Sequence, residues 1–330
     1  MENRKEGIEM KKIILIFVVS LFLASCMTFN PIQPYPNMQK NEYEYNYLYE
    51  MGNFSSDKLI IDIQGSGWSS VLGIKGLIGW NYISMGGMTL QELGKDHVLV
   101  IPEKWKRDPN TRAGINSGIY YEDIEARLLY TADNLTELYV SSINKYLTEH
   151  AYSSVVIIGS SEGALLLPGI YQGITAKDKI VCLVSYAGGG LTLYESIKIS
   201  RSAKFTPMAA RKQYEYIIEN YDKDIDEWSY SLGIDKYGNV LFWLTHMLKY
   251  DPFEYWKEIN IPVLFIHGEK DYNVAVESTR YIQENLPEKP FEYIYYKNMG
   301  HAPNPWALDY YFQWARIKKD IGNWVRKNES

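Results

Sequence analysis

The stretch Ser154–Gly163 has the sequence SVVIIGSSEG and decides how the chain folds. Its apolar, β-branched part, Val155–Ile158, is typical of a strand buried on both faces of a parallel sheet. Apolar residues follow and predict a helix, so Ser161 would lie on a sharp turn between strand and helix. Gly159 and Gly163 flank it at positions where a Cβ would clash. The pattern predicts a nucleophilic serine beside the free N–H groups of a helix start.

Apolar, strand-like runs recur on both sides of this turn. We expect strands at Glu42–Glu50, Leu59–Ile63, His97–Pro102, Ile180–Val184, Ile261–Gly268 and Phe291–Tyr296. The first of these alternates tyrosine with polar residues, which predicts a half-exposed strand at the start of the sheet. Strands that alternate with helical segments predict an α/β fold with a doubly wound, mostly parallel sheet.

Three helical segments are expected around these strands. Asn134 opens a pattern that resembles a capping box, and apolar residues at helical spacing follow it to about His150. Pro168 should kink or end the helix after Ser161 within two turns. The stretch from Ala307 to Val325 predicts a long amphipathic helix that packs on the sheet.

The strand pattern stops between Leu191 and Trp256. Helical segments are expected near Met208–Tyr221 and Val240–Tyr250, in a stretch rich in aromatic residues. An insertion between sheet strands, placed after the serine, predicts a helical cap over the site. Its aromatic side chains would form the core of the cap or contact a substrate, and the first role is the commoner one.

Three chemically useful side chains each follow the end of an expected strand: Ser161, Asp271 and His301. Reactive residues collect at the carboxyl ends of strands in doubly wound sheets. A serine hydroxyl needs a base within hydrogen-bond reach, and His301 could take its proton. Asp271 could hold the imidazole in the required tautomer and stabilise the imidazolium. The other four histidines lie on the wrong side of an element, in the cap or inside a strand.

The chain resembles the α/β-hydrolase family over about residues 42 to 328. The resemblance rests on the order Ser, Asp, His along the chain. It also rests on the motifs Gly159-x-Ser161-x-Gly163, His267-Gly268-x-x-Asp271 and Gly300-His301, and on the loop Gly65-Ser66-Gly67. It implies one hydrolase domain at residues 42–330, with the cap at about 191–256, and a catalytic triad of the three residues above.

The resemblance also implies an oxyanion hole made of backbone N–H groups. One would belong to Glu162 and the other to Ser66, with Gly67 as the alternative. Two positions depart from the usual pattern. Glu162 puts a carboxylate beside the oxyanion donor, so the side chain must point away from it. Gln64 stands where many relatives have histidine.

The N-terminal residues resemble a bacterial lipoprotein signal. Basic residues precede the apolar run Ile13–Leu23, which is too short to span a bilayer comfortably and predicts a signal peptide over residues 1–25. The run ends in Leu23-Ala24-Ser25-Cys26, which resembles a lipobox with Cys26 as the lipidation site. Residues 26–41 contain three prolines and predict an extended tether. The protein would thus be exported and lipid-anchored to a membrane of the bacterial cell envelope.

Composition limits the remaining possibilities. The 330 residues carry a formal net charge of −6, and no basic block lies outside the N-terminus, which argues against a nucleic-acid partner. Cys182 lies in an apolar run and is expected to be a buried, inert thiol. The glycine-rich loop after Ile63 lacks both dinucleotide and P-loop patterns. We therefore expect no cofactor and no metal.

These patterns predict a serine hydrolase that cleaves a small-molecule carboxylic ester or acyl substrate through an acyl-enzyme. A peptidase or amidase that uses the same triad is the alternative within enzymes. A catalytically silent fold that binds a partner at the cell surface is a third hypothesis. The intact set of Ser161, Asp271 and His301 disfavours that third hypothesis.

Overall fold

A computed structural model describes residues 39–44, 46–66, 92–104, 131–221, 247–303 and 310–330. The expected signal peptide, Cys26, most of the tether and the middle of the expected cap lie outside these ranges. Gly67, the alternative oxyanion donor, lies outside them as well. None of the helices in the described ranges is long and apolar enough to cross a membrane.

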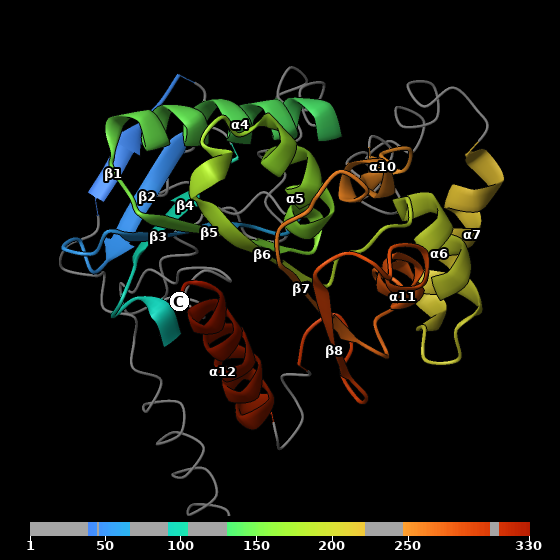
Figure 1. The fold of residues 1–330 in the computed structure, drawn as a ribbon. Helices are drawn as coiled ribbons and strands as arrows, with labels where there is room; N and C mark the ends of the chain where they lie inside the picture. Colours follow the sequence, from blue (N-terminus) through green and yellow to red (C-terminus); the bar gives the residue numbers. More distant parts are fainter. Residues whose placement is uncertain (1–38, 45, 67–91, 105–130, 222–246, 304–309) are drawn as a thin grey trace, which may run out of the picture.

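Eight strands in the described residues form one sheet (Figure 1). They are β1 (Gln39–Glu42), β2 (Tyr47–Gly52), β3 (Lys58–Ile63), β4 (Val98–Pro102), β5 (Ser154–Ser160), β6 (Ile180–Tyr186), β7 (Val263–Gly268) and β8 (Phe291–Tyr296). Their order across the sheet is β1-β2-β4-β3-β5-β6-β7-β8. β1 and β2 pair antiparallel with their neighbours, and the strands from β4 to β8 pair parallel. The prediction of a doubly wound, mostly parallel sheet is confirmed.

The tyrosine-rich run at the start of the sheet differs from the expected single strand. A turn separates β1 from β2, and the N–H of Tyr43 donates to the carbonyl of Asn46 across it, at 2.9 Å. The expectation of a half-exposed strand was wrong, because Leu48 and Tyr49 are both fully buried and pack into cores on opposite faces of the sheet. Two polar residues of the run, Asn46 and Glu50, are buried as well, and Glu50 accepts a hydrogen bond from Asn41.

Helices cover both faces of the sheet. Figure 1 shows α4 (Ala132–Glu149) and α5 (Glu162–Gly173) on one side and α12 (Tyr310–Asn328) on the other. Each face has its own hydrophobic core. Leu135 of α4 belongs to the first core, and Ile317 and Val325 of α12 belong to the second. The sheet is therefore the middle of three layers, and the expected closing helix packs against it.

The start of α4 lies three residues before the expected position. The N-cap is Thr131, whose side chain accepts a hydrogen bond from the N–H of Asn134 at 3.1 Å. Asn134 is therefore the third residue of the helix and not its cap. The helix ends as expected, with His150 as its C-cap.

α5 continues to Gly173, so the expectation that Pro168 could end the helix within two turns was wrong, and the alternative of a kink remains a prediction. Proline inside a helix costs about 3 kcal/mol, because it removes one hydrogen bond and crowds the preceding turn. Each buried leucine or isoleucine side chain contributes about 1.5–3 kcal/mol. Leu166, Leu167 and Ile170 are all fully buried, so packing against the sheet outweighs the cost.

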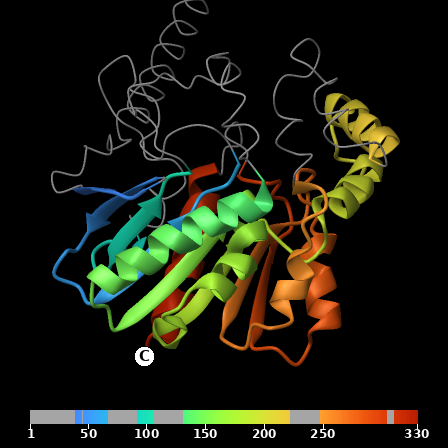
Figure 2. The ribbon, with the colours of Figure 1, turned by 90° about the horizontal axis from the view of Figure 1, so that it is seen from above.

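The expected cap region contains helices in the parts that the structure describes. They are α6 (Leu193–Ser202), α7 (Met208–Asn220) and α10 (Pro252–Trp256). Figure 1 and Figure 2 both place α6 and α7 on the β7–β8 side of the sheet, near α11 (Glu277–Asn285). α7 matches the helix expected near residues 208–221. That this region caps the site remains a prediction.

Cys182 lies in the middle of β6 and is completely buried. Burial raises the pKa of its thiol well above the usual range, because the thiolate would lose its hydration. A thiol in this environment is held in its unreactive, protonated form.

Candidate active site

Ser161 lies on a strained turn between β5 and α5. Its φ of 55° and ψ of −114° fall in a region that non-glycine residues rarely adopt. The close approach of the flanking backbone explains the glycines: a Cβ on Gly159 would collide with the backbone of Gly163, and one on Gly163 would collide with the carbonyl of Ile63. The local sequence therefore holds the Ser161 hydroxyl at the carboxyl edge of the sheet.

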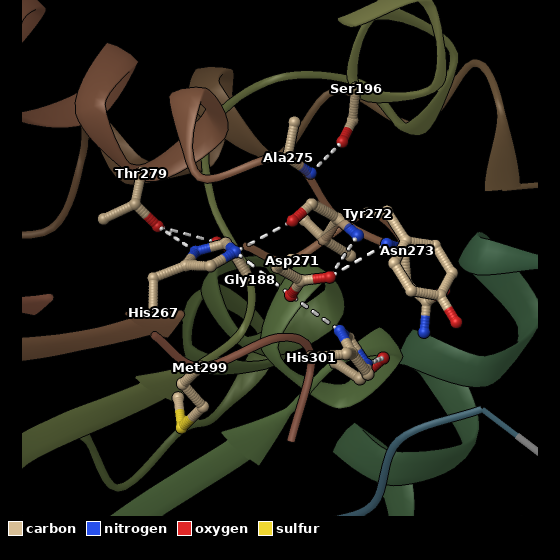
Figure 3. Close-up of polar contacts among 12 residues, drawn as sticks. Gly188, Ser196, His267, Asp271, Tyr272, Asn273, Ala275, Thr279, Met299 and His301 are labelled. Carbon is tan, nitrogen blue, oxygen red and sulfur yellow. Dashed lines mark hydrogen bonds and ion pairs between the residues drawn. The ribbon is translucent and has the colours of Figure 1, made fainter. Parts of the chain in front are cut away.

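The three residues expected to form a triad meet at this edge. His301 follows β8, and its Nε2 lies 2.8 Å from the Oγ of Ser161. The Nδ1 of the same ring lies 2.7 Å from Oδ2 of Asp271, which follows β7 (Figure 3). The side chain of His301 is 24% exposed and that of Asp271 is fully buried. A chain of two hydrogen bonds thus connects the hydroxyl of the half-buried Ser161 with a buried carboxylate.

Four donors surround the carboxylate of Asp271. Its Oδ1 accepts from the N–H groups of Asn273 and Val274, at 2.8 and 3.1 Å. Its Oδ2 faces His301 and, at 3.3 Å, Nε2 of His267. Burial by itself would raise the pKa of Asp271, but the two imidazoles outweigh burial and hold this pKa well below its usual range. Asp271 is therefore a carboxylate acceptor at neutral pH.

Tyr186, the last residue of β6, connects the serine and the histidine. Its carbonyl accepts a hydrogen bond from the N–H of Ser161 at 2.8 Å, and its hydroxyl donates to the carbonyl of His301 at 3.2 Å. Burial raises the pKa of the Tyr186 hydroxyl well above its usual range, so it remains a donor. Sequence reasoning missed this residue because tyrosine is used throughout the chain, at 29 positions.

The expected oxyanion loop lies against the serine. A Cβ on Gly65 would lie 3.1 Å from both the Cβ of Ser161 and the carbonyl oxygen of Ser160. Ser66 is the residue after Gly65, whose backbone packs against Ser161. Glu162 is the first residue of α5, where the N–H has no acceptor within the helix. The assignment of these two N–H groups to an oxyanion hole remains a prediction.

The carboxylate of Glu162 forms an ion pair with the ammonium of Lys104. Both side chains are buried, and Lys104 lies just after the end of β4. The ion pair shows that Lys104 attracts this carboxylate. That the carboxylate points away from the oxyanion donor remains a prediction. The sequence analysis did not predict this partner, because nothing local singles out Lys104 among the 34 lysines and arginines.

In the described ranges, no three His, Cys, Asp or Glu side chains are grouped so that they could hold a metal ion. The chemistry available at this edge of the sheet is that of a serine hydroxyl, an imidazole and a carboxylate. Such a set can transfer an acyl group from a carbonyl compound to the serine and then to water.

Comparison with known proteins shows the fold. No family model matches the chain. A peptidase of Bacillus subtilis named YtmA, itself described as uncharacterized, is 42% identical over 77 residues, which are 23% of this chain and 28% of that protein. The match thus spans less than a third of that relative's length.

Solved structures match over most of the chain. A lipase-esterase related protein of Clostridium acetobutylicum has a TM-score of 0.51 at 15% identity, over 86% of this chain and 99% of that one. An esterase of Pyrococcus furiosus has a TM-score of 0.56 at 16% identity, over 89% and 92%. An acylaminoacyl peptidase of Pyrococcus horikoshii has a TM-score of 0.55 at 13% identity, over 88% and 41%. The chain therefore has the α/β-hydrolase fold.

Proposed function

We propose that this protein is a serine hydrolase that cleaves carboxylic esters through an acyl-enzyme. The observation that carries the proposal is the chain of hydrogen bonds from Ser161 through His301 to Asp271, at 2.8 and 2.7 Å. These distances lie within the range in which a base can take a proton from a nucleophile. The α/β-hydrolase fold, shared with esterases and a peptidase, supports the same reaction class.

The proposed reaction has two halves. The Oγ of Ser161 attacks the ester carbonyl carbon while His301 takes the hydroxyl proton, and Asp271 stabilises the imidazolium that forms. The C–O bond to the leaving group then breaks, His301 returns the proton to the departing alkoxide oxygen, and an acyl-serine remains. Water attacks this ester with His301 again as the base, which releases the acid and restores the serine.

Backbone donors would stabilise the tetrahedral oxyanion in both halves. The N–H groups of Glu162 and Ser66 are proposed for this role, and one such donor is worth about 3–4 kcal/mol. The ion pair with Lys104 keeps the negative charge of Glu162 neutralised close to the oxyanion. An uncompensated carboxylate in that place would oppose the charge that develops in the transition state.

Cleavage of a peptide or amide is the second candidate. It is favoured by the similarity to the Bacillus subtilis and Pyrococcus horikoshii proteins, which are both named as peptidases. A chain-length series of p-nitrophenyl esters and the matching p-nitroanilides, assayed side by side, separates the two. The proposal expects turnover of esters to exceed that of anilides by orders of magnitude. Faster anilide turnover would favour the peptidase hypothesis.

We also propose that a lipid on Cys26 holds the protein at a membrane of the bacterial cell envelope. The support is the sequence from Ile13 to Cys26, which lies outside the described residues. Metabolic labelling with a radioactive fatty acid tests this proposal. The label should enter the wild-type chain and be absent from Cys26→Ala, and equal labelling of both would contradict the anchor.

A further inference from the structure

A second imidazole lies against the carboxylate of Asp271. His267 is the penultimate residue of β7, and its side chain is completely buried. Its Nε2 lies 2.9 Å from the carbonyl oxygen of Val274 and 3.3 Å from Oδ2 of Asp271. Figure 3 shows His267 and His301 approaching Asp271 from different directions.

The neighbours of this nitrogen fix where its proton is. A backbone carbonyl only accepts hydrogen bonds, and an ionised carboxylate does the same. The pKa of Asp271 is held below its usual range, so the carboxylate is ionised at neutral pH. Nε2 of His267 must therefore carry a hydrogen, which it donates to Val274 with Asp271 as a second acceptor.

The other nitrogen of the ring holds the imidazole in place. Nδ1 of His267 lies 2.8 Å from Oγ1 of Thr279, and the same hydroxyl lies 2.8 Å from the carbonyl oxygen of Gly188. The hydroxyl proton can point to Gly188 or to Nδ1. In either arrangement Nε2 keeps its hydrogen, so the donor toward Asp271 does not depend on this choice.

These contacts connect His267 to the loop that carries Asp271. Val274 donates its N–H to Oδ1 of Asp271 and receives the Nε2–H of His267 on its carbonyl. Two helices of the expected cap region, α6 and α7, also contact this loop. Ser196 of α6 accepts from the N–H of Ala275 at 2.6 Å, and Tyr214 of α7 donates to the carbonyl of Tyr272 at 2.8 Å.

We propose that His267 is a positioning residue for the hydrolysis. Its Nε2–H fixes the rotation of the Asp271 carboxylate, so that Oδ2 stays directed at Nδ1 of His301. This inference rests on the proposed function, because the orientation of His301 matters only if that residue acts as a base. Misplacing a catalytic group by about 1 Å can cost about a hundredfold in rate, so a loosened carboxylate has a measurable effect.

Two substitutions at this position separate positioning from packing. The amide nitrogen of His267→Gln reaches the place of Nε2 and can still donate toward Asp271. The shorter side chain of His267→Asn ends near the place of Nδ1 and leaves Asp271 without this donor. We expect His267→Asn to lower kcat for a p-nitrophenyl ester by about tenfold to a hundredfold with KM unchanged, and His267→Gln to retain most of the activity.

A proton NMR spectrum tests the effect of His267 on Asp271 without measuring turnover. The hydrogen shared by His301 Nδ1 and Asp271 should give a low-field proton resonance in the full-length protein. We expect this resonance in the wild type and in His267→Gln, and its shift or loss in His267→Asn. Equal resonances and equal kcat values in the two variants would overturn the positioning role.

The experiments still test the role of His267 if the protein is not a hydrolase or if His267→Asn does not fold. A wild-type protein that hydrolyses no ester and takes up no fluorophosphonate contradicts the proposed function, whereas the resonance still tests the contact at His267. If His267→Asn does not fold, Thr279→Val and Thr279→Ser replace it, since only the second retains the hydroxyl that holds the ring. A lower kcat in Thr279→Val than in Thr279→Ser supports the proposal, and equal values contradict it.

Discussion

Glu162 and Lys104 form a buried ion pair directly beside the residue that we propose as the nucleophile. Glu162 begins α5 and Lys104 follows β4, so the pair connects the serine turn with a strand two positions away across the sheet. Removing one partner of a buried pair deprives the other charge of that counter-ion, which is more costly than removing both.

The ion pair gives a prediction for stability. Lys104→Met should lower the free energy of unfolding by about 3–5 kcal/mol, and Lys104→Met combined with Glu162→Gln should recover most of that loss. Urea unfolding measures both. Lys327→Met is the matched control, because its pair with Glu292 is exposed, and it should leave the unfolding midpoint close to that of the wild type. A double variant no more stable than Lys104→Met would contradict the pairing.

Tyr186 gives a prediction for the geometry of the site. Tyr186→Phe removes the hydroxyl that donates to the carbonyl of His301 but keeps the carbonyl that accepts from Ser161. One such hydrogen bond is worth about 1 kcal/mol, which corresponds to about a fivefold change in rate. We expect labelling by a fluorophosphonate probe to slow by about that factor. Tyr296→Phe serves as the control, because Tyr296 lies on β8, which is separated from β6 by β7. An equal effect of both substitutions would argue against a specific role.

The carboxylate of Glu329, outside the candidate site, gives a prediction for stability in acid. The Glu329 side chain contacts Nε2 of His97 at 2.8 Å and Nζ of Lys58 at 3.2 Å. Burial would raise the pKa of Glu329, but these two partners outweigh burial and lower it. A carboxyl whose folded pKa is below its unfolded value stabilises the protein above the unfolded pKa, about 4.3 for glutamate. That contribution is lost as pH falls through the lower, folded pKa.

Glu329→Gln should therefore be less stable than the wild type at pH 7, and the difference should shrink as pH falls below about 4. Urea unfolding at pH 7, 5 and 3 measures the difference. Glu288→Gln, on an exposed loop, is the control and should show no such trend. A difference that stays constant over this range would mean that the carboxylate of Glu329 does not stabilise the fold through its charge.

Two helices of the expected cap region contact the loop that carries Asp271. Tyr214 and Ser196 hold the loop that carries Asp271, so replacing residues 191–256 would disturb the proposed triad as well. Tyr214→Phe is the milder change. It should slow ester turnover by up to about fivefold while the preference among acyl chain lengths stays the same. A changed chain-length preference in this variant would place Tyr214 in contact with substrate instead.

The sequence was sufficient to predict which strands would bring the three proposed catalytic residues together. Buried parallel strands are continuous apolar runs, so their carboxyl ends can be located without a structure. Ser161 and Asp271 follow such runs, whereas His301 follows β8, a tyrosine-rich strand that is only partly buried. The helix around Pro168 could not be predicted in the same way, because its length depends on how much surface the sheet buries.

Lys104 could not be identified from a local pattern, and the motif that contains His267 does not show which groups its ring contacts. Lys104 and His267 act on partners that are 58 and 4 positions away, and only the folded chain shows which polar groups face each other. His267 lies inside a strand, where a histidine is usually a satisfied core residue. The structure shows that it does have satisfied hydrogen bonds, but one of its neighbours is the proposed catalytic carboxylate.

The most direct test of the account is the reaction of the full-length protein with a fluorophosphonate probe, followed by mapping of the adduct by mass spectrometry. We predict one adduct, on Ser161, and a loss of ester turnover on the order of 10⁴-fold or more in a folded Ser161→Ala variant. An adduct on another serine, or turnover by Ser161→Ala close to that of the wild type, would contradict the proposed nucleophile and every role assigned around it.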